Sequence, residues 1–283
     1  MSHLPERLPA ALLPVLLVLL IVPALGEGQS AMAPATVPAY YAGLFGEESA
    51  ELTVYYKDGD TQIPYFDADT VVLVMDKVYR EGYGDYSKDP DYDLRAVTGE
   101  GTVTFVRENG YTMAVDAEAD TIAFRDYDMF VSHSFDTTVV EFTHSTGYDD
   151  EGRPAYLQRC ADMELSRYGD ELTVDLKPYG IDLLWEDGRL YLPAQTVTDL
   201  LLGDTYTIFL YNGEACFFLN YETYMDDLAD TTTGYAALFY AAQGQTRGQA
   251  LIEYTYHELC LTLDLFYGFR ESRGITSFDD YFE

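Results

Sequence analysis

Alternating apolar and polar residues predict two antiparallel β-hairpins in the first half of the chain. One spans residues 52–65 around an Asp-Gly turn, and the other spans residues 103–115 around an Asn-Gly turn. Both dipeptides are strong hairpin signals when alternating apolar runs flank them. Between the hairpins, the pattern predicts a helix over residues 67–79, with the carboxylate of Asp67 as its N-cap.

The second half of the chain repeats this order of elements. A hairpin over residues 181–193 with an Asp-Gly turn precedes a helix over residues 196–202 and a hairpin over residues 206–219 with an Asn-Gly turn. The stretch "IPYFDADTVVLVM" aligns with "LYLPAQTVTDLLL" without a gap. We therefore predict an α+β fold of two similar small antiparallel-sheet-plus-helix modules, followed by a C-terminal helical segment. The alternative is a chance similarity between short β segments.

Further elements lie between and after these modules. Strands are expected at residues 121–124 and 138–142, and a long helix is expected over residues 249–269. A last helix begins near Ser277, which is followed by an acidic first turn. The long helix has one apolar stripe, which needs a partner surface in the second module or outside this chain: Ile252, Tyr256, Leu259, Leu263 and Phe266. If the stripe is only partly covered, an exposed apolar patch is expected within residues 259–282.

The N-terminus has the pattern of an export signal. Residues 8–25 are almost wholly apolar, and small residues at Ala24 and Gly26 fit a cleavage site. The alternatives are an uncleaved membrane anchor and cleavage at a second site around residues 31–33. The small, Pro-containing residues that follow are interpreted as a linker outside the fold.

These patterns give five segments and an exported, extracellular or cell-envelope location. The expected segments are a signal peptide (1–26), a linker (27–49), a first α+β module (50–147), a second α+β module (148–225), and a loop and helical segment (226–283).

Composition narrows the class of partner. The formal net charge of −33 repels nucleic acid and anionic lipid, so membrane contact is expected only through the signal or anchor segment. The hydrophobic content of 48% and the 26 tyrosines are sufficient for a folded core. The three cysteines, Cys160, Cys216 and Cys260, are expected to be buried free thiols, with one disulfide as the alternative.

Catalytic signatures are weak, and no catalytic residue is assigned. A Ser/Lys dyad needs a desolvated lysine, whereas Lys57, Lys77, Lys88 and Lys177 all lie in polar surroundings. A triad would draw on His133, His144 or His257 with Ser132, Ser134 or Ser145, but no nucleophile elbow surrounds these serines. The chain is therefore expected not to cleave peptides.

No metal or cofactor site is assigned either. Asp89, Asp91, Asp93 and Glu100 have the spacing of a calcium-binding loop, but Leu94 occupies the position that requires glycine. Histidines at copper-ligand spacing do not occur. The many carboxylates single out no acid/base pair.

The stretch "LLWEDGRLYLPAQTVTDLLLG" resembles the copper amine oxidase N-terminal-like modules of exported proteins from Gram-positive bacteria. With "ELCLTLDLFYG" and "RGITSFDDYF", the order of elements over about residues 50–283 is similar to the N-terminal region of exported tail-specific (C-terminal-processing) serine peptidases. The resemblance implies a non-catalytic accessory region that binds a protein or peptide substrate or a peptidase domain, with the catalytic domain itself absent from this chain and expected after residues 226–283. None of the family's catalytic positions can be transferred to this chain. The alternative is a free-standing exported cell-envelope binding protein.

Overall fold

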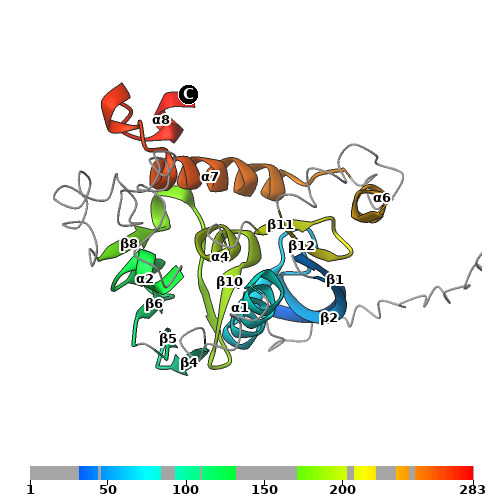
Figure 1. Ribbon diagram of the computed structural model, residues 1–283. Coiled ribbons are helices and arrows are strands. Elements are labelled where there is room, and N and C mark those ends of the chain that lie inside the picture. Colours follow the sequence, from blue (N-terminus) through cyan, green and yellow to red (C-terminus); the bar gives the residue numbers. More distant parts are fainter. Residues whose placement is uncertain are drawn as a thin grey trace, which may run out of the picture.

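The computed structural model describes residues 32–43, 46–83, 93–108, 110–131, 171–202, 207–220, 234–241 and 246–282. Two β-sheets and flanking helices give an α+β fold, and the C-terminal segment is helical, as predicted from the sequence (Figure 1). The predicted signal peptide, the predicted strand at residues 138–142 and the expected boundaries at 147/148 and 225/226 lie outside the described residues, whereas the expected boundary at 49/50 falls inside a strand.

The larger sheet has seven strands. Their spatial order is β11 (Thr207–Tyr211), β12 (Cys216–Asn220), β1 (Met32–Gly43), β2 (Gly46–Lys57), β3 (Tyr65–Asp67), β10 (Arg189–Pro193) and β9 (Leu184–Glu186). Neighbouring strands are antiparallel, except that β1 and β12 run parallel. The sheet thus combines strands from both halves of the sequence.

The smaller sheet is an antiparallel meander of five strands. They are β4 (Leu94–Thr98), β5 (Thr102–Arg107), β6 (Thr112–Asp116), β7 (Thr121–Phe124) and β8 (Leu172–Asp175). Buried and partly exposed residues alternate along β5 and β7, so one face of this sheet packs on the core. The predicted strand at residues 121–124 is confirmed as β7.

Helices cover the sheets and extend beyond them. The helical elements are α1 (Ala68–Tyr83), α2 (Tyr127–Val131), α4 (Ala194–Leu201), α6 (Gly234–Ala241), α7 (Gln249–Phe266) and α8 (Phe278–Phe282), with short 3₁₀ turns η4 (Lys177–Tyr179) and η6 (Glu271–Arg273). Figure 1 shows α6 and α8 near opposite ends of α7.

Local signals in the sequence place several of these elements. Asp187 and Gly188 both have positive φ between β9 and β10, and Asp58 and Gly59 do so after β2, as the Asp-Gly turns predict. Asp67 Oδ1 accepts the backbone N–H of Thr70 at 2.9 Å, which confirms this carboxylate as the cap of α1.

The two halves share their element order but not their sheet arrangement. β3 pairs with β10, with Phe66 opposite Leu192, so the first hairpins of both halves form one continuous sheet. The separate sheet expected for each module is therefore not found among the described residues. The second hairpins also separate, because β5 and β6 join the smaller sheet whereas β11 and β12 join the larger one. β3 and β10 are short strands, and each satisfies backbone hydrogen-bonding groups of the other along one side.

The interpretation of residues 27–49 as a linker outside the fold is also wrong. β1 lies inside the larger sheet, between β12 and β2, and buries Val37, Ala39 and Tyr41. Its prolines hid the strand pattern. Pro34 and Pro38 lie before Ala39, where pairing with β12 begins, so their missing N–H groups interrupt no ladder on that side.

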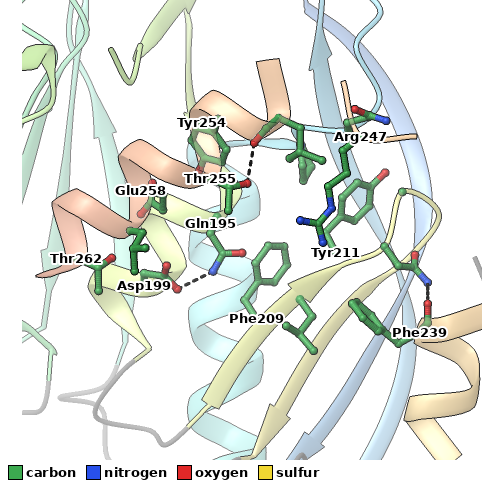
Figure 2. Close-up of a pocket in the computed structure, with 17 residues that line it drawn as sticks. Gln195, Asp199, Phe209, Tyr211, Phe239, Arg247, Tyr254, Thr255, Glu258 and Thr262 are labelled. Carbon is green, nitrogen blue, oxygen red and sulfur yellow. Dashed lines mark hydrogen bonds between the residues drawn. The ribbon is translucent and has the colours of Figure 1, made fainter. Parts of the chain in front are cut away.

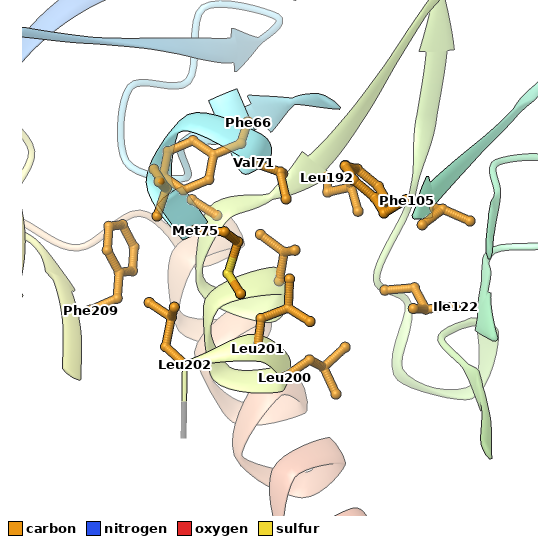
Figure 3. Close-up of a cluster of buried hydrophobic side chains, with 14 of the residues drawn as sticks. Phe66, Val71, Met75, Phe105, Ile122, Leu192, Leu200, Leu201, Leu202 and Phe209 are labelled. Carbon is orange, nitrogen blue, oxygen red and sulfur yellow. The ribbon is translucent and has the colours of Figure 1, made fainter. Parts of the chain in front are cut away.

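One hydrophobic core joins the two sheets. Figure 3 shows Met75 of α1 among side chains from both layers, with Phe66 and Phe209 on one side and Phe105 and Ile122 on the other. The three leucines at the end of α4 complete this cluster. The halves are consequently held together by shared apolar burial, which is the main stabilising term in folding.

Candidate functional site

A cleft of about 750 Å³ lies between the outer strand of the larger sheet and the long C-terminal helix. We call it the β11–α7 cleft. Figure 2 shows Gln195 and Asp199 of α4 and Tyr254, Glu258 and Thr262 of α7 on one side, with Phe209 and Tyr211 of β11 across from them. Its volume falls within the range typical of ligand-binding sites, about 300–1,000 Å³.

Polar groups from α4 and α7 form one wall of this cleft. Glu258 is 6% exposed, and its Oε2 atom accepts a hydrogen bond from the Thr196 hydroxyl at 2.7 Å. The backbone N–H of Thr196 also donates to the Tyr254 hydroxyl at 3.2 Å. Burial raises the pKa of Glu258 to about 7, nearby Asp199 adds to the rise, and hydrogen bonds from Thr196 and Tyr254 oppose it.

Asp199 is the second carboxylate of this wall. Gln195, one turn earlier on α4, donates a hydrogen bond of 2.7 Å to Asp199 Oδ1. Burial raises the pKa of Asp199 to about 6, and the bond from Gln195 opposes the rise. No lysine or arginine among the described residues forms an ion pair with Asp199 or Glu258. Two carboxyl groups that are costly to ionise therefore line the same cleft.

The opposite wall is aromatic and hydroxyl-rich. The Tyr211 hydroxyl shares a hydrogen bond of 2.5 Å with the Tyr56 hydroxyl, and burial raises the pKa of Tyr211. The ring of Phe209 packs at a tilt against the ring of Phe218, with 5.1 Å between their centroids. Arg247 is exposed and extends beside Tyr211 in Figure 2. The cleft thus combines an apolar floor with acidic and basic groups on different sides.

A second feature is a group of touching aromatic rings near the end of the chain. Its members, which we call the C-terminal aromatic cluster, are Tyr267, Phe269, Phe278, Tyr281 and Phe282. Successive ring centroids lie 5.5 to 6.0 Å apart. Phe278 is buried at its centre, whereas Phe269 is 66% exposed and Tyr281 is 64% exposed. The expected apolar patch within residues 259–282 is confirmed.

A buried carboxylate positions this cluster. Asp264 Oδ1 accepts the backbone N–H of Phe278 at 3.0 Å and lies 3.3 Å from Nη1 of Arg270. Its Oδ2 atom accepts the hydroxyl of Tyr179 in η4 at 2.8 Å. At the start of α8, the Ser277 hydroxyl accepts the N–H of Asp280 at 3.1 Å and so caps the helix that was expected to begin near this residue.

The predicted apolar stripe of α7 is not the face that packs on the protein. Ile252, Leu259 and Phe266 are exposed, whereas Glu258 and Leu261 are buried. Glu258 lies off that stripe in the sequence, and its burial is unexpected because a carboxylate is normally solvated. The hydrogen bond from Thr196 offsets the cost of burying the Glu258 carboxyl group. The two residues are 62 positions apart, and no sequence pattern indicates that they are in contact.

The structure places the described lysines in polar surroundings, as expected. Lys57 pairs with Asp182 at 3.0 Å, Lys77 pairs with Glu48, and Lys177 donates to the carbonyl of Glu118 at 3.2 Å. Lys88, His133, His144 and the three candidate serines lie outside the described residues. His257 lies on α7, and its Nδ1 atom is buried without a hydrogen-bond partner among the described residues.

Cys216 and Cys260 are free and buried, as predicted, while Cys160 lies outside the described residues. Burial raises the pKa of the Cys216 thiol. In the calcium-like run, Asp93 and Glu100 are exposed, and the two earlier aspartates lie outside the described ranges.

No group of three or more His, Cys, Asp or Glu side chains suited to a metal ion occurs within the part of the chain that the structure describes. No helix in those same ranges is long and apolar enough to cross a membrane.

Comparison with known protein families, with curated proteins and with solved structures found no match to this chain.

Proposed function

We propose that this chain is a non-catalytic accessory region of an exported serine peptidase of the tail-specific type. In this proposal it packs on the peptidase domain through the C-terminal aromatic cluster. The observation that carries the proposal is this exposed, contiguous aromatic surface. Such surfaces mark interaction sites, because large apolar patches left in water are unfavourable.

The cluster has the chemistry and the order of a protein interface. Phe and Tyr side chains contribute much of the binding energy at interfaces because each buries a large apolar area. Here the buried Phe278 ring supports Tyr281 and Phe282, and Asp264 fixes the backbone of Phe278. A surface ordered before binding loses less conformational entropy when a partner covers it.

Two further observations support an accessory role. The described lysines are engaged by Asp182, Glu48 or a backbone carbonyl, which does not favour the neutral lysine of a Ser/Lys dyad. The order of hairpin, helix and hairpin in both halves, followed by α7, agrees with the resemblance stated from the sequence.

The test begins with the coding sequence that follows Glu283. We expect the same reading frame to continue into a peptidase domain with a serine and a lysine for catalysis. That domain, produced separately, should bind the chain, and the double substitution of Phe269→Ser and Tyr281→Ser should weaken binding at least about tenfold. Leu238→Ser on α6 is the matched control, because Leu238 is an exposed apolar residue outside the cluster.

Two results would refute the proposal. One is an in-frame stop followed by an unrelated gene, and the other is binding that Leu238→Ser weakens as much as the cluster variant does. The first would favour the alternative function, a free-standing exported cell-envelope binding protein. The observation that favours this alternative is the β11–α7 cleft, whose lining includes no residue of the aromatic cluster.

A further inference from the structure

The outer edge of β11 borders the cleft. β11 is a terminal strand, and no strand of the described residues pairs with its outer side. The N–H of Asn212 donates to the carbonyl of Ala215 at 3.4 Å, which directs Asn212 toward β12. Along an antiparallel strand, the backbone N–H and C=O groups of successive residues point alternately toward and away from the neighbouring strand. Those of Leu210 therefore point toward β12, and those of Phe209 and Tyr211 point away from it, toward the open edge. The cleft is therefore lined by backbone groups that can hydrogen-bond to another strand.

The side chains around this edge are suited to an alternating peptide. Phe209 and Leu210 of β11 and Leu251 and Leu259 of α7 line the cleft, so apolar side chains have surfaces to contact. Asp199 and Glu258 add two carboxyl groups that no described lysine or arginine neutralises, as noted above. A cationic side chain placed there would compensate the cost of burying them as charges.

We propose that the β11–α7 cleft binds an extended peptide, which adds to β11 as a further strand and places a lysine or arginine side chain against Asp199 and Glu258. Charge complementarity identifies this occupant. The net charge of −33 attracts a basic segment and repels an acidic one. Strand addition supplies affinity through main-chain hydrogen bonds, and the pocket for one side chain supplies specificity.

This site is separate from the C-terminal aromatic cluster. The inference does not depend on the proposed docking function, and either can fail without the other. A peptide-binding cleft is consistent with both proposed functions, the free-standing binding protein and the accessory region of a peptidase.

The test measures peptide binding to the full chain by calorimetry and fluorescence anisotropy. The probe is a short blocked peptide of alternating valine and threonine with one central lysine. A second peptide carries glutamate in place of lysine, and a third keeps the lysine but is N-methylated at alternate backbone positions. We expect saturable binding of the lysine peptide, and at least about tenfold weaker binding of the other two.

Protein variants locate the site. Asp199→Asn should weaken binding of the lysine peptide about tenfold and should narrow the difference in affinity between the lysine and glutamate peptides. Glu253→Gln is the matched control, because Glu253 is an exposed carboxylate on α7 outside this cleft. Each variant is first checked for a thermal transition like that of the wild type.

Three outcomes would overturn the proposal. They are no saturable binding of the lysine peptide, equal binding of the lysine and glutamate peptides, and binding that N-methylation leaves unchanged. The N-methylated peptide keeps the strand-addition step falsifiable even if Asp199→Asn fails to fold.

Discussion

Glu258 of α7 accepts a 2.7 Å hydrogen bond from the hydroxyl of Thr196 on α4, and both residues are buried. This contact joins the C-terminal helix to the helix of the second half of the chain. It also holds a carboxyl group whose pKa burial raises to about 7. The junction therefore depends on the protonation state of one side chain.

We predict that Glu258→Gln reduces the pH dependence of stability. Because the pKa of Glu258 is higher in the folded chain, this carboxyl holds its proton more tightly there than in the unfolded chain. The stability that the bound proton provides is therefore lost as pH rises from 4.5 to about 7. For such a shift the loss is about 3 kcal/mol. Urea unfolding across this range should show a smaller decline for the variant than for the wild type.

Glu253→Gln serves as the control for this experiment, since it removes an exposed carboxylate from the same helix. Its pH profile should follow the wild type. If Glu258→Gln also declines as steeply as the wild type, the carboxyl does not titrate as this junction requires.

A second prediction concerns Asp67, which caps helix α1 and also accepts a hydrogen bond from Tyr55 of strand β2. Its Oδ1 atom caps α1, while its Oδ2 atom accepts the Tyr55 hydroxyl at 2.8 Å and lies 3.3 Å from Nη1 of Arg189. Burial and this carboxylate raise the pKa of Tyr55 to about 12. Asp67→Ala should reduce the free energy of unfolding by about 2–4 kcal/mol, because a helix cap and a buried hydroxyl both lose their partner.

Asp67→Ser separates the two contributions, because serine caps a helix but is too short to reach Tyr55 as well. Its loss of stability in urea unfolding should be smaller than that of the alanine variant. Equal losses for alanine and serine would mean that the cap contributes nothing measurable.

Features that depend on residues close together in the chain can be predicted from the sequence, whereas contacts between distant residues cannot. The Asp-Gly turns, the cap at Asp67 and the helix start near Ser277 depend on residues only a few positions apart, and the structure confirms them. The pairing of β3 with β10 joins Phe66 to Leu192, and no local pattern specifies such a contact.

The cleft escaped prediction for the same reason. Asp199 and Glu258 look like solvated helix residues until α4 and α7 are packed together. The strand at residues 32–43 was missed because alanine and proline replace the branched residues that normally mark a strand.

A third prediction follows from the shared core, in which Leu192 is fully buried. Leu192→Ala should cost about 2–5 kcal/mol, and the whole described fold should still unfold in a single transition. Circular dichroism and tyrosine fluorescence during urea unfolding should give coincident curves. Leu73→Ala, at an exposed position on α1, should change stability by less than about 0.5 kcal/mol. Two separate transitions would instead mean that the halves fold as independent modules.

The last prediction rests on the export signal expected from the sequence and concerns the N-terminus that its cleavage would leave. The sequence has two candidate cleavage sites, one after Gly26 and one after Ala33. The second would remove Met32, which is 4% exposed, packs with Tyr55 and Tyr191, and donates its backbone N–H to Glu186 at 3.0 Å. We therefore expect the mature chain to begin at Glu27.

Intact-mass measurement of the secreted protein tests this directly, and a mature chain that begins at Pro34 would contradict it. A stability comparison supplies the physical reason independently of export. A chain that begins at Pro34 should be about 2–4 kcal/mol less stable to urea than one that begins at Glu27, because it loses a buried methionine and the pairing of Ala33 with Tyr56. Met32→Ala in the longer chain should reproduce most of this loss. If the two chains unfold at the same urea concentration, the first residues of β1 do not contribute to the fold.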